Sequence, residues 1–336
     1  MTRRGLLIAG GCAALVLLAG CGSGEPAKPG RLRVGLVAKS LGNGFFDAVH
    51  KGAEEAAGEL DVEVLFVGPT TPTAEGQIEV LNNLIAQRVD AIAISANDPD
   101  AVVPTLKRAL QRGIKVVSYD SAVAPEGRNA HLAPSSDPLI GETVIALTAE
   151  LAPQADGKAR GKFAVVSATP TSTNQNAWLE EMRKAMAAQP GLELVGVAYG
   201  DDVSDKSYRE AVALLKQHPD LSVLVSISSI GIVASARAVE DQGLTGKVKV
   251  TGLGLPSELA GYVQKGVVPK FAIWNPIDLG YSTTQLAVNL VRGADVTQPV
   301  SIGRMGSVTL AADGVGAMSK PFIYDASNVA DFAQIF

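Results

Sequence analysis

Short runs of β-branched and other apolar residues alternate with longer segments of helical periodicity along nearly the whole chain. In the first such unit, residues 32–38 predict a strand, and residues 45–59 place apolar side chains at the spacing of one helix face. Parallel neighbours in a sheet need a long crossover connection such as a helix, whereas antiparallel neighbours can be joined by a tight turn. Strands that alternate with helices of this length are therefore expected to run parallel. Parallel sheets are covered by helices on both faces, so the fold class is α/β.

This alternation occurs in two series. Strands of the first series are predicted at 32–38, 62–67, 91–95 and 116–119, with helices at 45–59, 73–87 and 100–112. A second series follows a predicted helix at 138–151, with strands at 163–167, 192–198, 223–226 and 248–251. Two series in a chain of 336 residues indicate two doubly wound parallel-sheet lobes.

The first residues do not belong to this alternation. Arg3 and Arg4 precede an apolar run at 6–19, which is too short to span a membrane and is typical of a secretory signal. Residues 1–20 are therefore predicted to be a signal peptide, exported by either the general or the twin-arginine route.

The signal ends in the motif LAGC at 18–21, which is similar to the lipobox of bacterial lipoproteins. In such proteins the cysteine, here Cys21, is diacylated and becomes the mature N-terminus. The residues that follow are rich in Gly, Pro and Ser, so 21–30 is predicted to be a lipidated tether. The expected location is the periplasm or the outer face of the cell membrane.

Composition excludes several function classes. The formal net charge is −5 with no basic run, which does not suit nucleic-acid binding. Cys12 lies in the signal and Cys21 would be acylated, so no thiol remains for catalysis or a metal. The chain has no phosphate-binding loop, no nucleophile elbow and no His/Cys cluster at metal spacing. We expect a binding protein without cofactor, metal or catalytic residues, although paired carboxylates leave a carbohydrate hydrolase as an alternative.

Ligands of parallel sheets bind beyond the carboxyl ends of the strands, and those positions here are rich in amides, carboxylates and aromatic rings. They are Lys39, Asn43, Phe45, Phe46, Asp98 and Asp120 in the first series, and Asn174, Gln175, Trp178, Trp274 and Asn275 in the second. Planar polar groups bind adjacent hydroxyls, and aromatic faces cover the C–H side of a sugar ring. The pattern predicts a carbohydrate site.

Several of these residues also have a purely structural interpretation. Phe45 and Phe46 are adjacent on a helix, and one core face does not easily take both rings, so either both pack in the core or, as we expect, at least one faces a cleft. Asp98 precedes a helix start and is equally suited to capping. Asp120 ends an apolar strand, where it either caps a turn or meets a ligand. Trp178 either packs at a lobe surface or lines the site.

A family resemblance adds to this interpretation. The stretches that carry it include KSLGNGFFDA (39–48), GPTTPTAEGQIEVLNNLIAQ (68–87), RGIKVVSYDSAVAPEGR (112–128), ATPTSTNQNAW (168–178) and FAIWNPIDLGYS (271–282). With the lipobox and the two lobes, these stretches resemble the type I periplasmic sugar-binding proteins of bacterial ABC importers. Within that group they are most similar to the rhamnose-binding component.

The resemblance implies a three-crossing hinge between an N-lobe, at 31–135 plus 277–308, and a C-lobe, at 136–276 plus 309–336. It adds Ser229 to the expected ligand-binding residues. It also implies a monomer that closes on a monosaccharide, most simply L-rhamnose, and delivers it to a membrane permease. A sugar-sensing receptor that presents the closed form to a chemoreceptor or kinase remains an alternative.

Binders of the furanosyl signal autoinducer-2 are the main rival within the family. They share the lysine, carboxylate and glutamine at Lys39, Asp120 and Gln175. This chain has Asn174 where they carry aspartate, and Ile227 where they carry proline, which favours a deoxyhexose. Ribose and galactose binders share the two phenylalanines but typically place an aspartate near Gly254, and this chain has none there.

Overall fold

The computed structural model describes residues 30–336. The predicted signal peptide, Cys21 and nearly all of the predicted tether lie outside the described residues. Residues 32–336 form one compact unit, which contains two lobes. No helix in the described part of the chain has the length and apolar character needed to cross a membrane.

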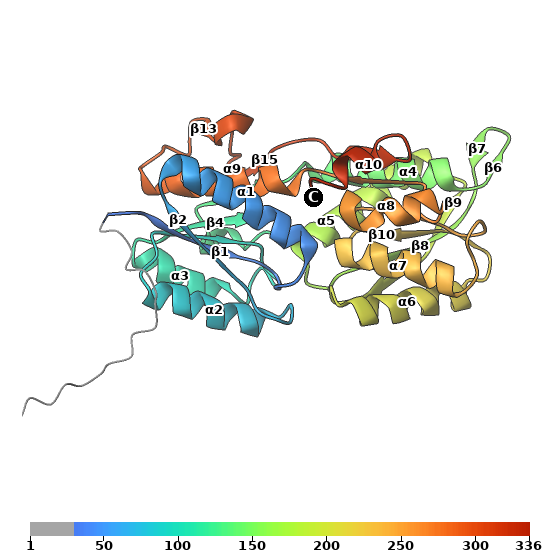
Figure 1. Ribbon diagram of the computed structural model, residues 1–336, viewed down its shortest axis with the longest axis horizontal. Helices are drawn as coiled ribbons and strands as arrows, with labels where there is room; N and C mark the ends of the chain where they lie inside the picture. Colours follow the sequence, from blue (N-terminus) through green and yellow to red (C-terminus); the bar gives the residue numbers. More distant parts are fainter. Residues whose placement is uncertain (1–29) are drawn as a thin grey trace, which may run out of the picture. The chain divides into compact units, whose positions relative to one another are not determined.

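The first lobe is built on a six-stranded sheet with the order β15-β5-β4-β3-β1-β2 and parallel pairing throughout. Its strands are β1 (Arg33–Val37), β2 (Glu63–Val67), β3 (Ala91–Ile94), β4 (Lys115–Tyr119), β5 (Ala130–Ala133) and β15 (Val315–Ala317). The covering helices are α1 (Gly44–Leu60) and α9 (Pro276–Val291) on one face, and α2 (Ala74–Ala86) and α3 (Val103–Gln111) on the other (Figure 1).

The second lobe has a parallel sheet of order β11-β10-β8-β9. Its strands are β8 (Gly161–Ser167), β9 (Leu192–Tyr199), β10 (Leu221–Ser226) and β11 (Lys249–Gly252), extended by an antiparallel pair of β12 (Lys270–Ile273) and β16 (Phe322–Asp325). Its helices are α4 (Asp137–Leu151), α5 (Thr173–Ala185), α6 (Ser204–Gln217), α7 (Ser229–Asp241), α8 (Pro256–Gln264) and α10 (Val329–Phe332). The predicted α/β fold with two parallel-sheet lobes is confirmed.

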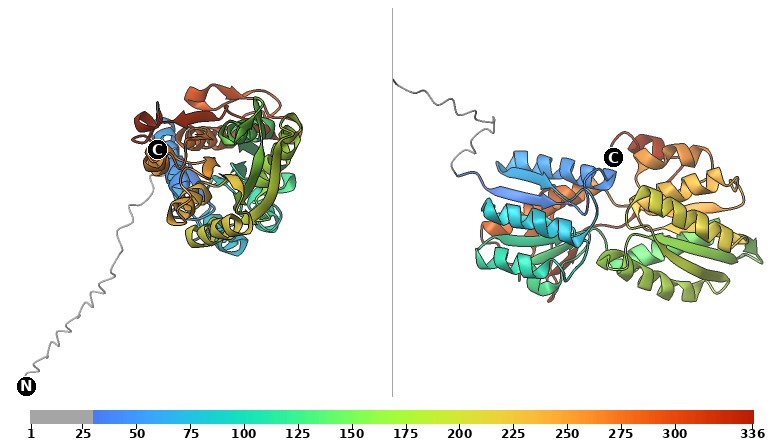
Figure 2. Two further views of the ribbon diagram at one scale, coloured as in Figure 1. Left: turned by 90° about the vertical axis from the view of Figure 1, so that its right-hand side faces the viewer. Right: turned by 90° about the horizontal axis from the view of Figure 1, so that it is seen from below.

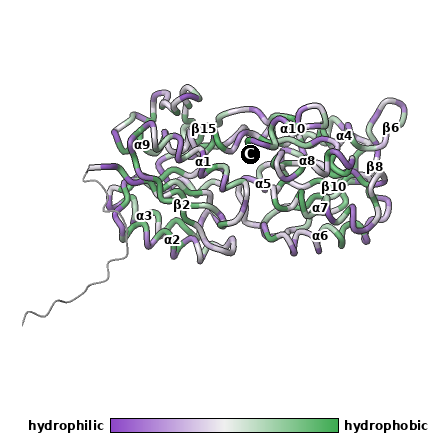
Figure 3. Tube along the Cα trace, in the orientation of Figure 1, coloured by the Kyte–Doolittle hydropathy of each residue, from purple (hydrophilic) through white to green (hydrophobic). Residues whose placement is uncertain are grey.

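Four short strands lie outside the two main sheets. They are β6 (Gln154–Ala155), β7 (Lys158–Ala159), β13 (Val300–Ser301) and β14 (Ser307–Val308), paired as two small hairpins. Figure 2 gives two further views of the helices that cover each sheet. Hydrophobic residues lie along the inner strands, whereas the turn between β6 and β7 is hydrophilic (Figure 3).

The chain passes between the lobes three times, in the connections β5–α4, β12–α9 and β15–β16. One predicted boundary is wrong. Residues 309–336 were expected in the second lobe, but β15 pairs with β5 in the first sheet, with Gly316 opposite Leu132. A three-residue strand carries no readable hydrophobic period, and only its long-range pairing assigns it to a lobe.

Two glycines let α1 and α9 pack backbone to backbone. A Cβ on Gly52 would lie 1.8 Å from the carbonyl oxygen of Ile277, and a Cβ on Gly280 would lie 1.8 Å from that of Val49. Any larger residue at either position therefore forces the helices apart. This contact fixes the position of α1 against α9, and the first turn of α1 lines the cavity described below.

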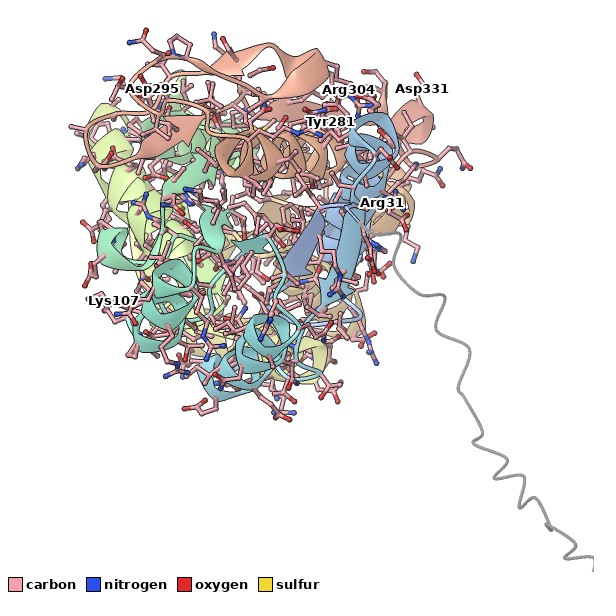
Figure 4. The ribbon with its side chains drawn as sticks, turned by 90° about the vertical axis from the view of Figure 1, so that its left-hand side faces the viewer. Arg31, Lys107, Tyr281, Asp295, Arg304 and Asp331 are labelled. Carbon is pink, nitrogen blue, oxygen red and sulfur yellow. The ribbon has the colours of Figure 1, made fainter. Side chains whose placement is uncertain are left out.

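Arg304 fastens the segment after α9 to the first lobe. Its guanidinium carbon lies 4.2 Å from the centre of the Tyr281 ring, and Figure 4 shows the two residues side by side. Nη1 donates to Glu55 at 2.7 Å, and Nη2 donates to Asp278 at 3.1 Å. The chain is thus held against α1 and α9 before it returns to form β15.

Candidate ligand-binding site

Side chains of both lobes surround one cavity at the carboxyl ends of the strands. Ten predicted residues line it: Lys39, Asn43, Phe45, Phe46, Asp120, Asn174, Gln175, Trp178, Ser229 and Trp274. The space between them, counted together with the open solvent at its mouth, is about 390 Å³. A small molecule held there would contact both lobes.

Lys39 lies two residues beyond β1 and is almost fully buried, and its backbone is held by two side-chain amides. Gln77 of α2 donates from Nε2 to the carbonyls of Ala38 at 3.0 Å and Ser95 at 2.8 Å. Asn97 donates from Nδ2 to the carbonyl of Lys39 at 2.9 Å. These bonds fix the ends of β1 and β3, and so they position the lysine at the cavity wall.

Asp120 directly follows β4 in the left-handed conformation, with φ of 55°, which Asp tolerates better than most residues. Its carboxylate accepts from Ser95 Oγ at 2.8 Å and from Asn174 Nδ2 at 2.9 Å. Burial raises its pKa, and the charge of Asp202 adds to the rise, whereas Lys39 and the two hydrogen bonds oppose it. The result is a buried, partly satisfied acceptor at the cavity.

Asn174, in the first turn of α5, connects the second lobe to the charged groups of the first. Besides donating to Asp120, it accepts from Lys39 Nζ at 3.5 Å and from the backbone N–H of Gln175 at 2.8 Å. Gln175 accepts at Oε1 from Ser167 Oγ and from the backbone N–H of Ala168, both at 2.7 Å. The N–H of Ala168 requires an acceptor, so Nε2 of Gln175 remains as a donor for a ligand.

The aromatic side chains form a continuous wall. Phe45 packs edge-on against Phe46 and Trp274, with distances between ring centres of 5.3 Å and 6.2 Å. The ring centres of Trp274 and Trp178 lie 5.5 Å apart. Phe46 also contacts Tyr119, at 6.4 Å, inside the first lobe. Both phenylalanines line the cavity, and the sequence led us to expect this of at least one of them.

The two tryptophans differ in their indole N–H groups. Trp178 donates from Nε1 to Asp137 Oδ1 at 3.0 Å. Trp274 is 3 % exposed, and its Nε1 has no hydrogen-bond partner among the described residues. A buried donor of this kind is costly without an acceptor, and this one belongs to a side chain that lines the cavity.

Two predicted site residues do not line the cavity. Asp98 accepts from the backbone N–H groups of Asp100 at 3.0 Å and Ala101 at 2.9 Å, which is the turn-capping alternative. Asn275 is the N-cap of α9 and accepts from the N–H of Ile277 at 2.9 Å. Both polar side chains satisfy local backbone groups instead.

The cavity also contains residues that the sequence analysis did not assign to it. They are Asp202, Ile227, Ser228, Leu253 and Ile273. Asp202 has φ of 51° and accepts from Ser228 Oγ at 2.5 Å. It follows β9, so the rule used for the other strand ends would have found it.

Chemically, the site offers separate donors and acceptors beside an aromatic wall. The part of the chain that the structure describes contains no cluster of three His, Cys, Asp or Glu residues able to hold a metal. Such an arrangement suits a small molecule that carries several hydroxyl groups.

Comparison with known proteins identifies the family. A family model described as a periplasmic binding protein domain matches residues 34–295, and the chain belongs to this family. The D-ribose/D-allose-binding protein of Pseudomonas aeruginosa is 30% identical over 254 residues, which cover 72% of this chain and 75% of that protein. The chain is thus a sugar-binding protein of the ABC transporter family, whose members are exported.

Solved structures extend the comparison. An ABC transporter solute-binding protein from Clostridium phytofermentas with bound L-rhamnose is 34% identical, with a TM-score of 0.83, covering 91% of this chain and 99% of that one. LsrB from Clostridium saccharobutylicum in complex with AI-2 has a TM-score of 0.85 over 90% of this chain and 99% of that one. Its identity is 22%, so it supports the fold alone. These relatives are sugar-binding transport proteins and not enzymes.

Proposed function

We propose that this protein binds L-rhamnose and delivers it to an ABC importer. The observation that carries the proposal is the cavity itself, which combines an aromatic wall with polar groups of both lobes. Trp274, part of that wall, has an N–H without a hydrogen-bond partner among the described residues. The relative that contains bound L-rhamnose, at 34% identity, supports the same sugar.

Each polar group has a distinct role in this proposal. Asp120 accepts a hydrogen bond from a sugar hydroxyl, and Lys39, Gln175 and Trp274 donate to sugar oxygens. The rings of the aromatic wall cover the apolar C–H side of the sugar. Because the groups come from both lobes, sugar binding favours the form in which the lobes are closed.

Delivery follows from closure and anchoring. We propose that the three connections between the lobes act as the hinge, and that the closed monomer docks on the membrane permease. Diacylation of Cys21 would keep the protein at the membrane, where its concentration near the permease is high. Replacing Cys21 by alanine should release the exported protein from the membrane fraction, whereas unchanged membrane association would contradict the anchor.

The test of the ligand is calorimetric titration of the mature chain with Cys21 replaced by serine. L-rhamnose, D-ribose and autoinducer-2 are compared at the same protein concentration, with a thermal-shift measurement alongside. Tight binding of rhamnose with weak binding of the other two supports the proposal. Heat from autoinducer-2 or ribose alone would contradict the proposed sugar, and no response to any of the three would contradict the proposed ligand class.

A further inference from the structure

Three neighbouring strands of the second lobe present aliphatic side chains to the cavity. Ile227 follows β10, Leu253 follows β11, and Ile273 is the last residue of β12. All three are buried, with exposed fractions of 1%, 2% and 2%. Trp274 follows Ile273 directly, so the aliphatic group continues into the aromatic wall.

The pairing of the strands places these three side chains at one edge of the sheet. Ser226 is opposite Gly252 in the pairing of β10 with β11, so Ile227 and Leu253 come next in register. Leu253 in turn pairs with Ala272, the residue before Ile273. Ile273 therefore lies one register position beyond Leu253, and the three residues meet at the cavity that all of them line.

The hydroxyl-bearing side chains closest to them in the chain already form hydrogen bonds within the protein. Ser226 Oγ donates to the carbonyl of Val166 at 3.0 Å, and Thr251 Oγ1 donates to that of Lys270 at 2.8 Å. Ser228 donates to Asp202. A ligand hydroxyl placed against the aliphatic group would therefore lose its water without gaining a donor from these side chains.

We infer that Ile227, Leu253 and Ile273 hold the methyl group of the bound sugar and select a 6-deoxy sugar over the same sugar with a hydroxymethyl group. The inference rests on the proposed sugar-binding function and names the residues that set its specificity. Lys39 and Asp120 of the first lobe, together with Gln175 and Trp274 of the second, then bind the ring oxygens and hydroxyls, and the three aliphatic side chains select against one additional hydroxyl.

Three sugars of identical ring configuration isolate this contact. L-lyxose, L-rhamnose and L-mannose carry a hydrogen, a methyl and a hydroxymethyl group at the same ring carbon. The dissociation constant of L-rhamnose should be roughly 10-fold lower than that of L-lyxose and up to about 100-fold lower than that of L-mannose. Equal affinity for L-rhamnose and L-mannose would overturn the inference while leaving the sugar-binding function intact. Absence of binding by all three would instead contradict the proposed function on which the inference rests.

Variants locate the contact. In Leu253→Ala the preference for L-rhamnose over L-lyxose should fall from roughly 10-fold to about 2-fold, because the methyl group of the sugar loses the side chain against which it packs. Val250→Ala is the matched control, since Val250 is equally buried in β11 but does not line the cavity. Val250→Ala should leave the ratio of the L-rhamnose and L-lyxose affinities unchanged. Because both sugars are measured on the same protein, this ratio does not depend on the fraction of protein that is folded.

A polar replacement tests the selection directly. Leu253→Asn keeps the size of the side chain and supplies a donor and an acceptor, so the L-mannose to L-rhamnose affinity ratio should rise at least about 10-fold. If this variant does not fold, Ile227→Ser provides the same test at the neighbouring strand. Loss of the L-rhamnose preference in Val250→Ala, or its retention in all the cavity variants, would overturn the assignment.

Discussion

The two lobes share a strand–helix topology but differ in the residues that come directly after their strands at the cavity. In the first lobe, β1 and β4 are followed by charged side chains, Lys39 and Asp120. In the second lobe, Ile227 and Leu253 follow β10 and β11, and Ile273 is the last residue of β12. The one charged residue of this lobe at the cavity is Asp202, which follows β9. Residues at and beyond the end of a strand are less constrained by packing than those inside it. The same architecture can therefore carry a charged wall, Lys39 and Asp120, in the first lobe and an apolar wall, Ile227, Leu253 and Ile273, in the second.

The charged wall needs more support than the apolar one. Gln77 and Asn97 bond the backbone around Lys39, and Ser95 bonds the carboxylate of Asp120. A buried charge without such partners would cost several kcal/mol, whereas a buried aliphatic side chain stabilises the lobe by its burial alone. We therefore expect substitutions in the first lobe to affect binding more strongly than substitutions in the second.

Asp120→Ala tests the charged wall and carries the largest expected effect. Sugar affinity should fall at least about 100-fold, because a charged hydrogen-bond partner is lost and Lys39 is left less well paired. Titration calorimetry with L-rhamnose measures the change. The control is Asp98→Ala, which removes a carboxylate that caps a turn outside the cavity and should leave affinity unchanged. An equal loss in both variants would show that the effect is not local to the cavity.

Gly52→Ala tests whether the first lobe depends on the close contact of α1 with α9. The new Cβ would clash with the carbonyl of Ile277, so the free energy of unfolding should fall by about 3 kcal/mol. Chemical denaturation of the mature chain measures it.

Gly58→Ala, in the same helix, is the matched control for this clash. A Cβ there meets nothing within 4 Å, so the variant should gain up to about 1 kcal/mol from helix propensity. If both alanines have effects of the same sign and size, the contact between the two helices is not what limits stability.

The sequence predicted the fold better than the site. Strands and helices could be assigned because their periodicity is local, while β15 could not, because three residues depend on a distant partner. Asp98 and Asp120 look alike in sequence, since each follows a strand. Only the structure distinguishes a carboxylate bonded to its own turn from one held at the cavity by Ser95 and Asn174.

The apolar half of the cavity was invisible to sequence reasoning for a different reason. Leu253 follows an apolar strand and Ile273 ends one, and an apolar residue in such a place is interpreted as core. Polar residues beyond strands attract attention, whereas aliphatic ones do not. That they line one cavity becomes apparent only from the three-dimensional structure.

His131 makes the first lobe sensitive to acid. It is buried in β5 with Nδ1 2.9 Å from Ser118 Oγ, and burial together with the charge of Arg128 lowers its pKa to about 3. An unfolded histidine has a pKa near 6.5, so the unfolded state binds more protons below that pH and stability falls. Between pH 7 and pH 5 the loss should be about 2 kcal/mol.

The variant His131→Asn isolates this contribution, because asparagine does not titrate. The raised pKa of Asp120 acts in the opposite direction, so the difference between wild type and variant is the informative quantity. Denaturation at pH 7 and pH 5 should show a smaller loss in the variant by about 2 kcal/mol. Identical pH dependence in the two proteins would exclude His131 as the source.

The two tryptophans of the second lobe provide the smallest and most discriminating comparison. Trp274→Phe keeps an aromatic ring but removes the unpartnered Nε1–H, so sugar affinity should fall roughly 10-fold while the stability of the sugar-free protein changes by less than about 1 kcal/mol. Trp178→Phe removes a donor that Asp137 already uses, so it should lower stability by about 1–2 kcal/mol and change affinity less. Calorimetry and thermal unfolding on both variants measure the pair. If Trp274→Phe reduced affinity as much as Asp120→Ala, the second lobe would contribute as much to hydrogen bonding of the sugar as the first. The proposed difference between the charged wall of the first lobe and the apolar wall of the second would then be wrong.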